Sequence, residues 1–316
     1  MGKTVPMSRR AIWVNLLLYP THSLPTAAAP VFVGVGLALA HGVFALVPAL
    51  VGFFSSWLVH IAGLFLDNYE LLTKHPEVRE HPELNEAMES GALTRAALIA
   101  ATLGCLALSL LPAPYLYPIG GWPVVVLGIV GIVSSVSYTA GPLPQTRYGL
   151  ADPVFVLMYG VVAEWGIYYI EAAAHAASGA RLAVVAEMPW TVYVLGLPVG
   201  ALVTAVMVID DIRDREFDRV KGWRTTAVCL GLAWSRVEFI GFYVFAYLAP
   251  VFYWLALGRG IAVLLPLLTL PLAWKLARAI STIERRDDLI PMTPKAAMLS
   301  LLYGLLSGIG IALSQG

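Results

Sequence analysis

Apolar positions along this chain come in long runs that polar segments interrupt. Nine such runs have about the 20 mostly apolar residues that a helix needs to cross a bilayer. They lie near residues 24–41, 44–66, 94–111, 121–138, 151–173, 189–210, 236–257, 260–277 and 294–314. We therefore predict an all-α fold, a polytopic membrane protein with nine transmembrane helices in a bundle.

The composition agrees with a membrane protein. Hydrophobic residues make up 59% of the 316 positions and charged residues 13%, whereas about a quarter of the residues of a soluble domain are charged. The partner that this balance indicates is the lipid bilayer. The net charge of zero gives no sign of nucleic-acid binding. Cys105 and Cys229 lack metal-ligand spacing, and we interpret both as apolar filler.

The distribution of basic residues predicts the orientation. We read the opening segment MGKTVPMSRR as a cytoplasmic lead-in and not as a signal peptide, because further spans follow and no cleavage site does. If the N-terminus is inside and nine helices alternate, only Arg181 and Arg259 of the 20 basic residues fall outside, which leaves 18 inside. We expect an integral protein of the cell inner membrane, with its C-terminus on the outer side.

Two polar segments on the predicted inner side resemble each other. LDNYELLTK, residues 66–74, and DDIRDREFD, residues 210–218, each end the second helix of a half. A shift of 144 residues places Asp67 on Asp211, Glu70 on Asp214 and Lys74 on Asp218. We predict one domain, residues 1–316, with a four-helix duplication: pseudo-repeats at about 24–138 and 151–277, and an extra helix at 294–314.

Both segments would present acidic stripes to one another. Asp211, Asp214 and Asp218 have the i, i+3, i+7 spacing of one helix face. Carboxylates so close together near a bilayer need cations between them. Oxygen ligands without histidine or cysteine suit Mg²⁺, and Mg²⁺ beside an apolar pocket indicates a ligand with a diphosphate head and an apolar tail. The alternative is a solvated helix end whose acids pair with neighbouring arginines.

The motifs resemble those of the UbiA superfamily of intramembrane prenyltransferases. DDIRDREFDRVKGWRTTAVCLG is similar to the second aspartate-rich motif of that family, whereas the first motif is degenerate here. SYTAGPLPQTRYGLADPVFVLMYG, residues 137–160, looks like a segment of the branch that prenylates 1,4-dihydroxy-2-naphthoate on the way to menaquinone. The resemblance implies Mg²⁺-dependent transfer from a prenyl diphosphate to an aromatic or quinoid acceptor, with the active site on the cytoplasmic side.

The resemblance also implies roles for single residues. The catalytic and metal-binding set would be Asp67, Glu70, Asp211, Asp214 and Asp218. The substrate-binding set would be Asn68, Lys74, Tyr138, Arg147, Asp210, Lys221 and Arg224. In the second set the basic residues would neutralise diphosphate oxygens, and Tyr138 would line the seam between site and tail channel.

Two other functions stay open at this point. In a membrane terpene cyclase of the same fold the prenyl cation would be trapped by its own double bonds. A membrane carrier is the second alternative, although carriers usually bind near the midplane and both acidic stripes lie at the cytoplasmic end.

Several further polar residues have two interpretations. Residues 74–90, with glutamates at every third position from 77 to 89, predict an amphipathic cap over the pocket, and one of these glutamates could bind metal instead. We expect His81 at the surface and Glu171 in contact with water. His60 is either a packed interface residue or within reach of an aromatic acceptor. Glu164 either bonds to a neighbouring helix or faces the pocket.

Overall fold

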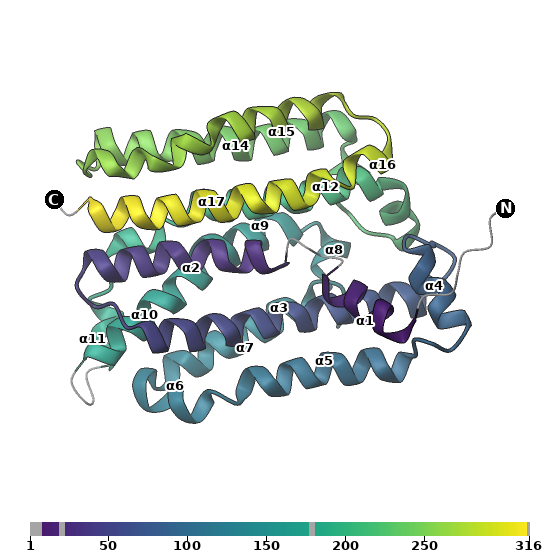
Figure 1. Cartoon of the computed structure of the whole chain (residues 1–316), viewed down its shortest axis with the longest axis horizontal. Coiled ribbons are helices and arrows are strands. Elements are labelled where there is room, and N and C mark those ends of the chain that lie inside the picture. Colours follow the sequence, from purple (N-terminus) through teal and green to yellow (C-terminus); the bar gives the residue numbers. More distant parts are fainter. Residues whose placement is uncertain (1–7, 19–22, 177–180, 315–316) are drawn as a thin grey trace.

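The structure, a computed structural model, describes residues 8–18, 23–176 and 181–314, and all regular elements in these ranges are helices. They run side by side along the long axis of the molecule (Figure 1). The α-helices are α1 Arg9–Leu18, α2 Ser23–Ala40, α3 Leu46–Lys74, α4 Pro82–Glu89, α5 Arg95–Leu110, α6 Ala113–Gly120, α7 Trp122–Ser137, α8 Gln145–Tyr148, α9 Ala151–Leu157, α10 Ala163–His175, α11 Arg181–Ala186, α12 Leu197–Lys221, α13 Thr226–Cys229, α14 Leu232–Ala256, α15 Leu270–Thr282, α16 Arg286–Leu289 and α17 Met292–Leu313. A π-helical turn spans Met158–Val162, and 3₁₀ turns span Trp190–Tyr193 and Ile261–Thr269. The predicted all-α fold is confirmed.

Seven helical segments of the described chain are long and apolar enough to cross a membrane, and they cover seven of the nine predicted stretches. An eighth span results if α5 and α6 count as one helix, bent by 43°. Pro112 and Pro114 lie at this bend, where a proline ring interrupts the helical hydrogen bonds. The remaining stretch forms α7, which is apolar but has 16 residues. The count of nine spans therefore stays a prediction.

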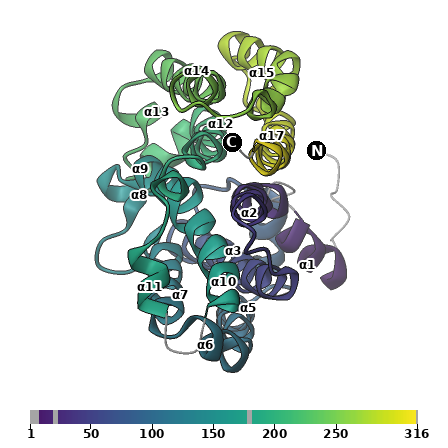
Figure 2. The same ribbon diagram turned by 90° about the vertical axis from the view of Figure 1, so that its left-hand side faces the viewer.

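Helix α12 passes through the middle of the bundle. The end-on view places α12, α17 and α2 between a group formed by α14 and α15 and a group that contains α3, α5, α7 and α10 (Figure 2). Val199, Leu202, Val206 and Ile209 on α12 are at most 2% exposed. Because this apolar stretch leads directly into the acidic residues after Ile209, packing of α12 carries those acids into the interior.

Helices α2 and α17 approach each other through glycine. A Cβ atom on Gly308 would lie 2.1 Å from the carbonyl oxygen of Phe32, and one on Gly304 would lie 2.4 Å from that of Ala29. Real side chains do not fit at these distances. Small residues allow such close backbone contact, which replaces the hydrophobic driving force that is missing between helices in lipid.

The polar segment after α3 folds back over one end of the bundle. Leu84 and Ala87 of α4 join a buried cluster with Phe65 and Leu72 of α3. Helices α4 and α16 lie at the same end of the molecule, opposite α6 and α11 (Figure 1). This end holds the residues discussed next.

The close contact of α2 and α17 leads to a stability prediction. Gly308→Leu should lower the free energy of unfolding by about 1–3 kcal/mol or more, because the new side chain forces the two backbones apart. Gly241→Leu on α14 is the matched control, since a Cβ on Gly241 meets nothing within 4 Å. Thermal unfolding in detergent measures both variants, and equal melting temperatures would show that the contact is loose.

Candidate active site

A cavity of about 690 Å³ lies between α3, α7, α9, α10 and α12. One end is polar and sits under the α4 cap, where it is lined by Asp67, Asn68, Glu80, His81, Asp210, Asp211, Arg213, Asp214, Asp218, Lys221 and Thr293. Towards α6 the lining becomes apolar, with Leu110, Leu116, Val124, Val125, Ile167 and Ile170. The space therefore suits a long ligand with an anionic head and a hydrocarbon tail.

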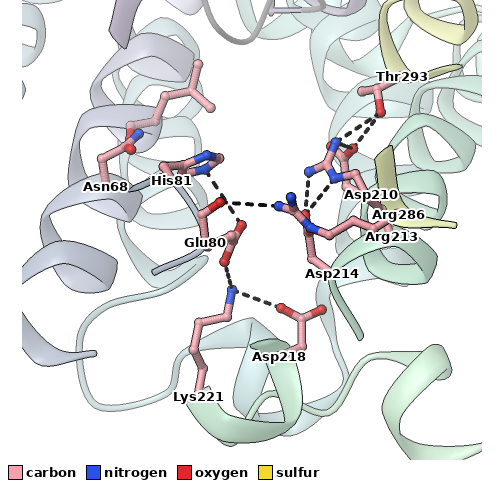
Figure 3. A network of polar contacts seen from close by, with 11 residues as sticks. Asn68, Glu80, His81, Asp210, Arg213, Asp214, Asp218, Lys221, Arg286 and Thr293 are labelled. Carbon is pink, nitrogen blue, oxygen red and sulfur yellow. Dashed lines mark hydrogen bonds and ion pairs between the residues drawn. The ribbon is translucent and has the colours of Figure 1, made fainter. Parts of the chain in front are cut away.

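Asp214 lies between two arginines. Arg213 donates from Nε to Asp214 Oδ2 at 2.8 Å and from Nη1 to Asp210 Oδ1 at 2.5 Å. Arg286, from the first turn of α16, donates from Nε to Asp214 Oδ1 at 2.9 Å. Thr293 on α17 donates its hydroxyl to Asp210 Oδ1 at 2.6 Å (Figure 3). These contacts tie α16 and α17 to the acidic end of α12.

Lys221 connects α12 to the cap. Its Nζ lies 2.9 Å from Asp218 Oδ1 and 2.8 Å from Glu80 Oε2, and its side chain is only 3% exposed (Figure 3). The same ammonium group lies 3.7 Å from the centre of the Trp223 ring. Glu80 also has His81 beside it, with 3.7 Å between Oε1 and Nε2. Burial lowers the pKa of His81 more than the Glu80 carboxylate raises it.

Asp67 and Asp211 are less well compensated, because Lys221, the cation that acts most strongly on Asp67, is already paired with Glu80 and Asp218. In the described part of the chain neither forms an ion pair, and Asp67 Oδ1 is buried without a hydrogen-bond partner. The strongest charge interactions of Asp211 are with other acids, among them Asp152 and Glu238. Tyr138 lies close enough to both Asp67 and Asp211 for their charges to act on its hydroxyl group. The lining of this end contains six acidic residues and only two basic ones, Arg213 and Lys221, so that ionisation of all the acids calls for a further cation.

The donor set fits a hard divalent ion. Carboxylate oxygens from α3 and α12 are the ligands that Mg²⁺ prefers, and Mg²⁺ usually takes only one or two of them and completes its shell with water and phosphate. Among the described residues no three acidic, histidine or cysteine side chains are already arranged around one point. Asp67 and Asp211 are thus the residues best placed to hold an ion, and the other acids are held by basic side chains.

Comparison with known proteins decides the family. The sequence model of the UbiA prenyltransferase family matches residues 27–302. The chain belongs to this family. It is an integral membrane prenyltransferase, with the helical fold and the apolar spans that the family membership requires.

Individual UbiA relatives are similar over most of their length. The 1,4-dihydroxy-2-naphthoate octaprenyltransferase of Escherichia coli (strain K12) is 27% identical over 98% of this chain and 97% of its own. UbiA prenyltransferase domain-containing protein 1 of Homo sapiens is 27% identical over 81% of this chain and 70% of its own. The apo structure of a UbiA homolog from Aeropyrum pernix K1 has a TM-score of 0.58 at 17% identity, and covers 91% of this chain and 97% of that one. This last likeness shows the fold.

Most of the predicted site residues of this UbiA protein line the cavity: Asp67, Asn68, Tyr138, Asp210, Asp211, Asp214, Asp218 and Lys221. The structure does not bring the other four to it, namely Glu70, Lys74, Arg147 and Arg224.

The reason is clear for the pair on α3. Lys74 is the last residue of the helix, two turns beyond Asp67, and its Nζ lies 2.6 Å from Glu70 Oε2. The side chain of Lys74 is 55% exposed. The two charges thus neutralise each other beside the cavity. Arg147, on α8, and Arg224, between α12 and α13, are both exposed.

Sequence reasoning missed several residues of the polar end. His81 was expected at the surface, and this was wrong, because the cap folds over the cavity and brings His81 into its lining. Glu80 also lines the cavity. It is one of the glutamates of the cap segment, and their regular spacing was the available signal. Arg286 and Thr293 gave no such signal, since they reach the site from α16 and α17.

Two intramembrane acids also differ from expectation. Glu171, expected to be wet, is fully buried, and its Oε1 accepts a hydrogen bond from the backbone nitrogen of Ala45 at 3.2 Å. This contact stabilises the start of α3. Glu164 is fully buried and is not part of the cavity lining; it packs against Gly196, where a Cβ would lie 1.5 Å from its Oε2. Its pocket-facing interpretation is therefore wrong.

The contact between Lys221 and Glu80 leads to a second prediction. Glu80→Gln should destabilise the protein by about 1–3 kcal/mol, because the buried ammonium of Lys221 loses one of two carboxylates. Glu89→Gln is the matched control, since the Glu89–Arg79 pair in the same cap is more than half exposed on both sides. Thermal unfolding compares the two variants. A Glu80→Gln protein as stable as the control would show that the cap is not held by this pair.

Proposed function

We propose that this protein catalyses the Mg²⁺-dependent transfer of a prenyl group from a prenyl diphosphate to an aromatic or quinoid acceptor of the 1,4-dihydroxy-2-naphthoate type. The observation that supports this proposal most strongly is the presence of two acids without an ion-pair partner among the described residues, Asp67 and Asp211, at the head of a cavity that becomes apolar towards α6. The name of the Escherichia coli relative supports the choice of acceptor.

The polar end would hold the diphosphate. Asp67 from α3 and Asp211 from α12 would bind Mg²⁺, which when bound withdraws electron density from the diphosphate and so favours its departure. Lys221, Arg213 and Arg286 already point their donors into this region, each towards a carboxylate. Phosphate oxygens are strong acceptors for such groups, and these donors would stabilise the negative charge that grows as the C1–O bond breaks.

The remainder of the cavity would hold the prenyl chain. Its apolar lining excludes water, and exclusion of water protects an allylic cation from hydrolysis. An electron-rich ring carbon of the acceptor would then form the new bond to C1 and lose its proton, or its carboxyl group as CO₂, to restore the aromatic ring, so that no nucleophile from the protein is required. The glutamates of the cap would close the polar end from above, with Glu80 fixed to Lys221.

We further propose that the polar end faces the cytoplasm, in the cell inner membrane, with the N-terminus inside and the C-terminus outside. The asymmetry of the basic residues supports this orientation, since 18 of 20 fall on one side of the predicted spans.

The proposed metal-binding role of Asp67 and Asp211 leads to a third prediction. Asp67→Asn and Asp211→Asn should each lower kcat/KM at least about 100-fold, because each removes a charge that holds the metal. Asp288→Asn is the control, an exposed aspartate on α16. The assay combines purified protein, Mg²⁺, prenyl diphosphates of several lengths and 1,4-dihydroxy-2-naphthoate under nitrogen, with products read by mass spectrometry. EDTA should abolish product formation and added Mg²⁺ should restore it.

The same assay separates the alternatives. Undiminished transfer in EDTA, or wild-type rates in both site variants, would contradict the proposed chemistry. Cyclic hydrocarbon without any acceptor adduct would indicate the cyclase. Intact prenyl diphosphate, together with Mg²⁺-independent solute movement across proteoliposomes, would indicate the carrier.

A further inference from the structure

A second polar group lies deeper in the cavity. His60 on α3 and Tyr159 on the π-turn both line it, and His60 Nδ1 is hydrogen-bonded to the Tyr159 hydroxyl. His60 precedes Asp67 by seven residues, which corresponds to about 10 Å along the helix axis. The pair therefore lies below the acidic end, where the cavity has turned largely apolar.

The position of Tyr159 is fixed by its backbone. The residue belongs to the π-helical turn Met158–Val162, and such turns often occur at functional sites. Gly160 packs against α12, where its Cβ would lie 3.0 Å from Leu197 Cα, and a Cβ on Gly200 would lie 2.7 Å from Gly160 Cα. This contact holds the π-turn against the helix that carries Asp211. The Tyr159 hydroxyl thus lies at a fixed depth in the cavity relative to the acids.

Aromatic side chains connect the two levels of the cavity. The ring centres of Tyr138 and Phe155 are 5.5 Å apart, and those of Phe155 and Tyr159 are 5.3 Å apart. All three side chains line the cavity, and His60 approaches from the opposite helix. A flat aromatic ligand can stack on this wall between the diphosphate level and the His60–Tyr159 pair.

The serines near this level direct their hydroxyl groups to backbone carbonyls. Ser55 donates to Val51 at 2.9 Å, and Ser135 donates to Val59 at 2.9 Å. The His60–Tyr159 pair differs, because it joins two side chains from different helices that both border the open space. A polar ligand atom at this depth would find its best hydrogen-bonding group here.

We propose that Tyr159, oriented by His60, binds an oxygen substituent of the aromatic acceptor and so sets which ring carbon faces C1 of the prenyl donor. This inference rests on the proposed function, since it assigns the acceptor subsite of the same cavity. It makes the enzyme selective for hydroxylated rings, because a ring without the matching hydroxyl group forms one hydrogen bond fewer in a water-poor cavity.

The test measures acceptor binding directly, without donor and without turnover. Radiolabelled 1,4-dihydroxy-2-naphthoate and its analogues 1-hydroxy-2-naphthoate and 4-hydroxy-2-naphthoate are titrated anaerobically against wild type and Tyr159→Phe. The change should raise the Kd of the dihydroxy ligand about 3- to 10-fold, the effect of one hydrogen bond. One of the two analogues lacks the hydroxyl group that contacts Tyr159. Its Kd for wild type should exceed that of the dihydroxy ligand by the same factor, and Tyr159→Phe should not raise this Kd further.

Matched variants separate this role from a structural one. Tyr169→Phe removes a buried hydroxyl that donates to Gly120 at 2.5 Å and does not line the cavity, so its Kd values should equal those of wild type. His60→Asn keeps a hydrogen-bonding group beside Tyr159 and should retain more affinity than His60→Leu. In turnover the KM for the acceptor should rise in Tyr159→Phe, whereas the KM for the prenyl diphosphate should change less than about twofold.

The outcomes distinguish the two proposals. If wild type binds the naphthoates and Tyr159→Phe binds all three with unchanged Kd, the acceptor subsite is overturned and the proposed function stands. If Tyr159→Phe raises the Kd of both analogues by the same factor as that of the dihydroxy ligand, the hydroxyl contact is likewise overturned. If wild type binds none of the naphthoates and transfers no prenyl group to them, the proposed function fails and the subsite fails with it.

Discussion

A carboxylate that a membrane protein removes from water has to meet positive charge, and this requirement organises the inner end of the molecule. The apolar packing of α12 carries Asp214 and Asp218 into the interior, where they are 4% and 2% exposed. Each then recruits a basic partner, Arg286 for the first and Lys221 for the second. These partners bring α16 to the site, and the second contact of Lys221, with Glu80, fixes the cap. The closed polar end follows from the burial of two aspartates.

The same cavity contains two acids that form no ion pair with a described side chain. Asp67 on α3 and Asp211 on α12 both line a space that continues into an apolar channel. In such a site the basic side chains hold the cap and the helix ends. A bound ion would contact the diphosphate. The aromatic wall and the His60–Tyr159 pair then lie one level deeper. A diphosphate, a reacting carbon and an acceptor ring would occupy successive depths.

The sequence predicted those features that depend on neighbouring residues. Runs of apolar residues predict helices, and the i, i+3, i+7 spacing predicts that Asp211, Asp214 and Asp218 reach one cavity. Contacts between distant segments could not be predicted in this way. Arg286 meets Asp214 across 72 residues. The family resemblance also placed Lys74 in the site, although its exposed side chain pairs with Glu70 outside the cavity lining. The four-helix duplication stays a prediction; of the residues that it superposes, Asp67 and Asp211 both line the cavity.

The central claim is that Asp67 and Asp211 form no ion pair with a described side chain because they bind a divalent ion, which in turn binds the diphosphate. Electron paramagnetic resonance of Mn²⁺, which replaces Mg²⁺ in many oxygen-ligand sites, measures this directly. Addition of a non-hydrolysable prenyl thiolodiphosphate to wild type should immobilise Mn²⁺, and the immobilised signal should be lost in Asp67→Asn and in Asp211→Asn. A spectrum that is unchanged by the analogue, or one that is identical in wild type and both variants, would contradict the account.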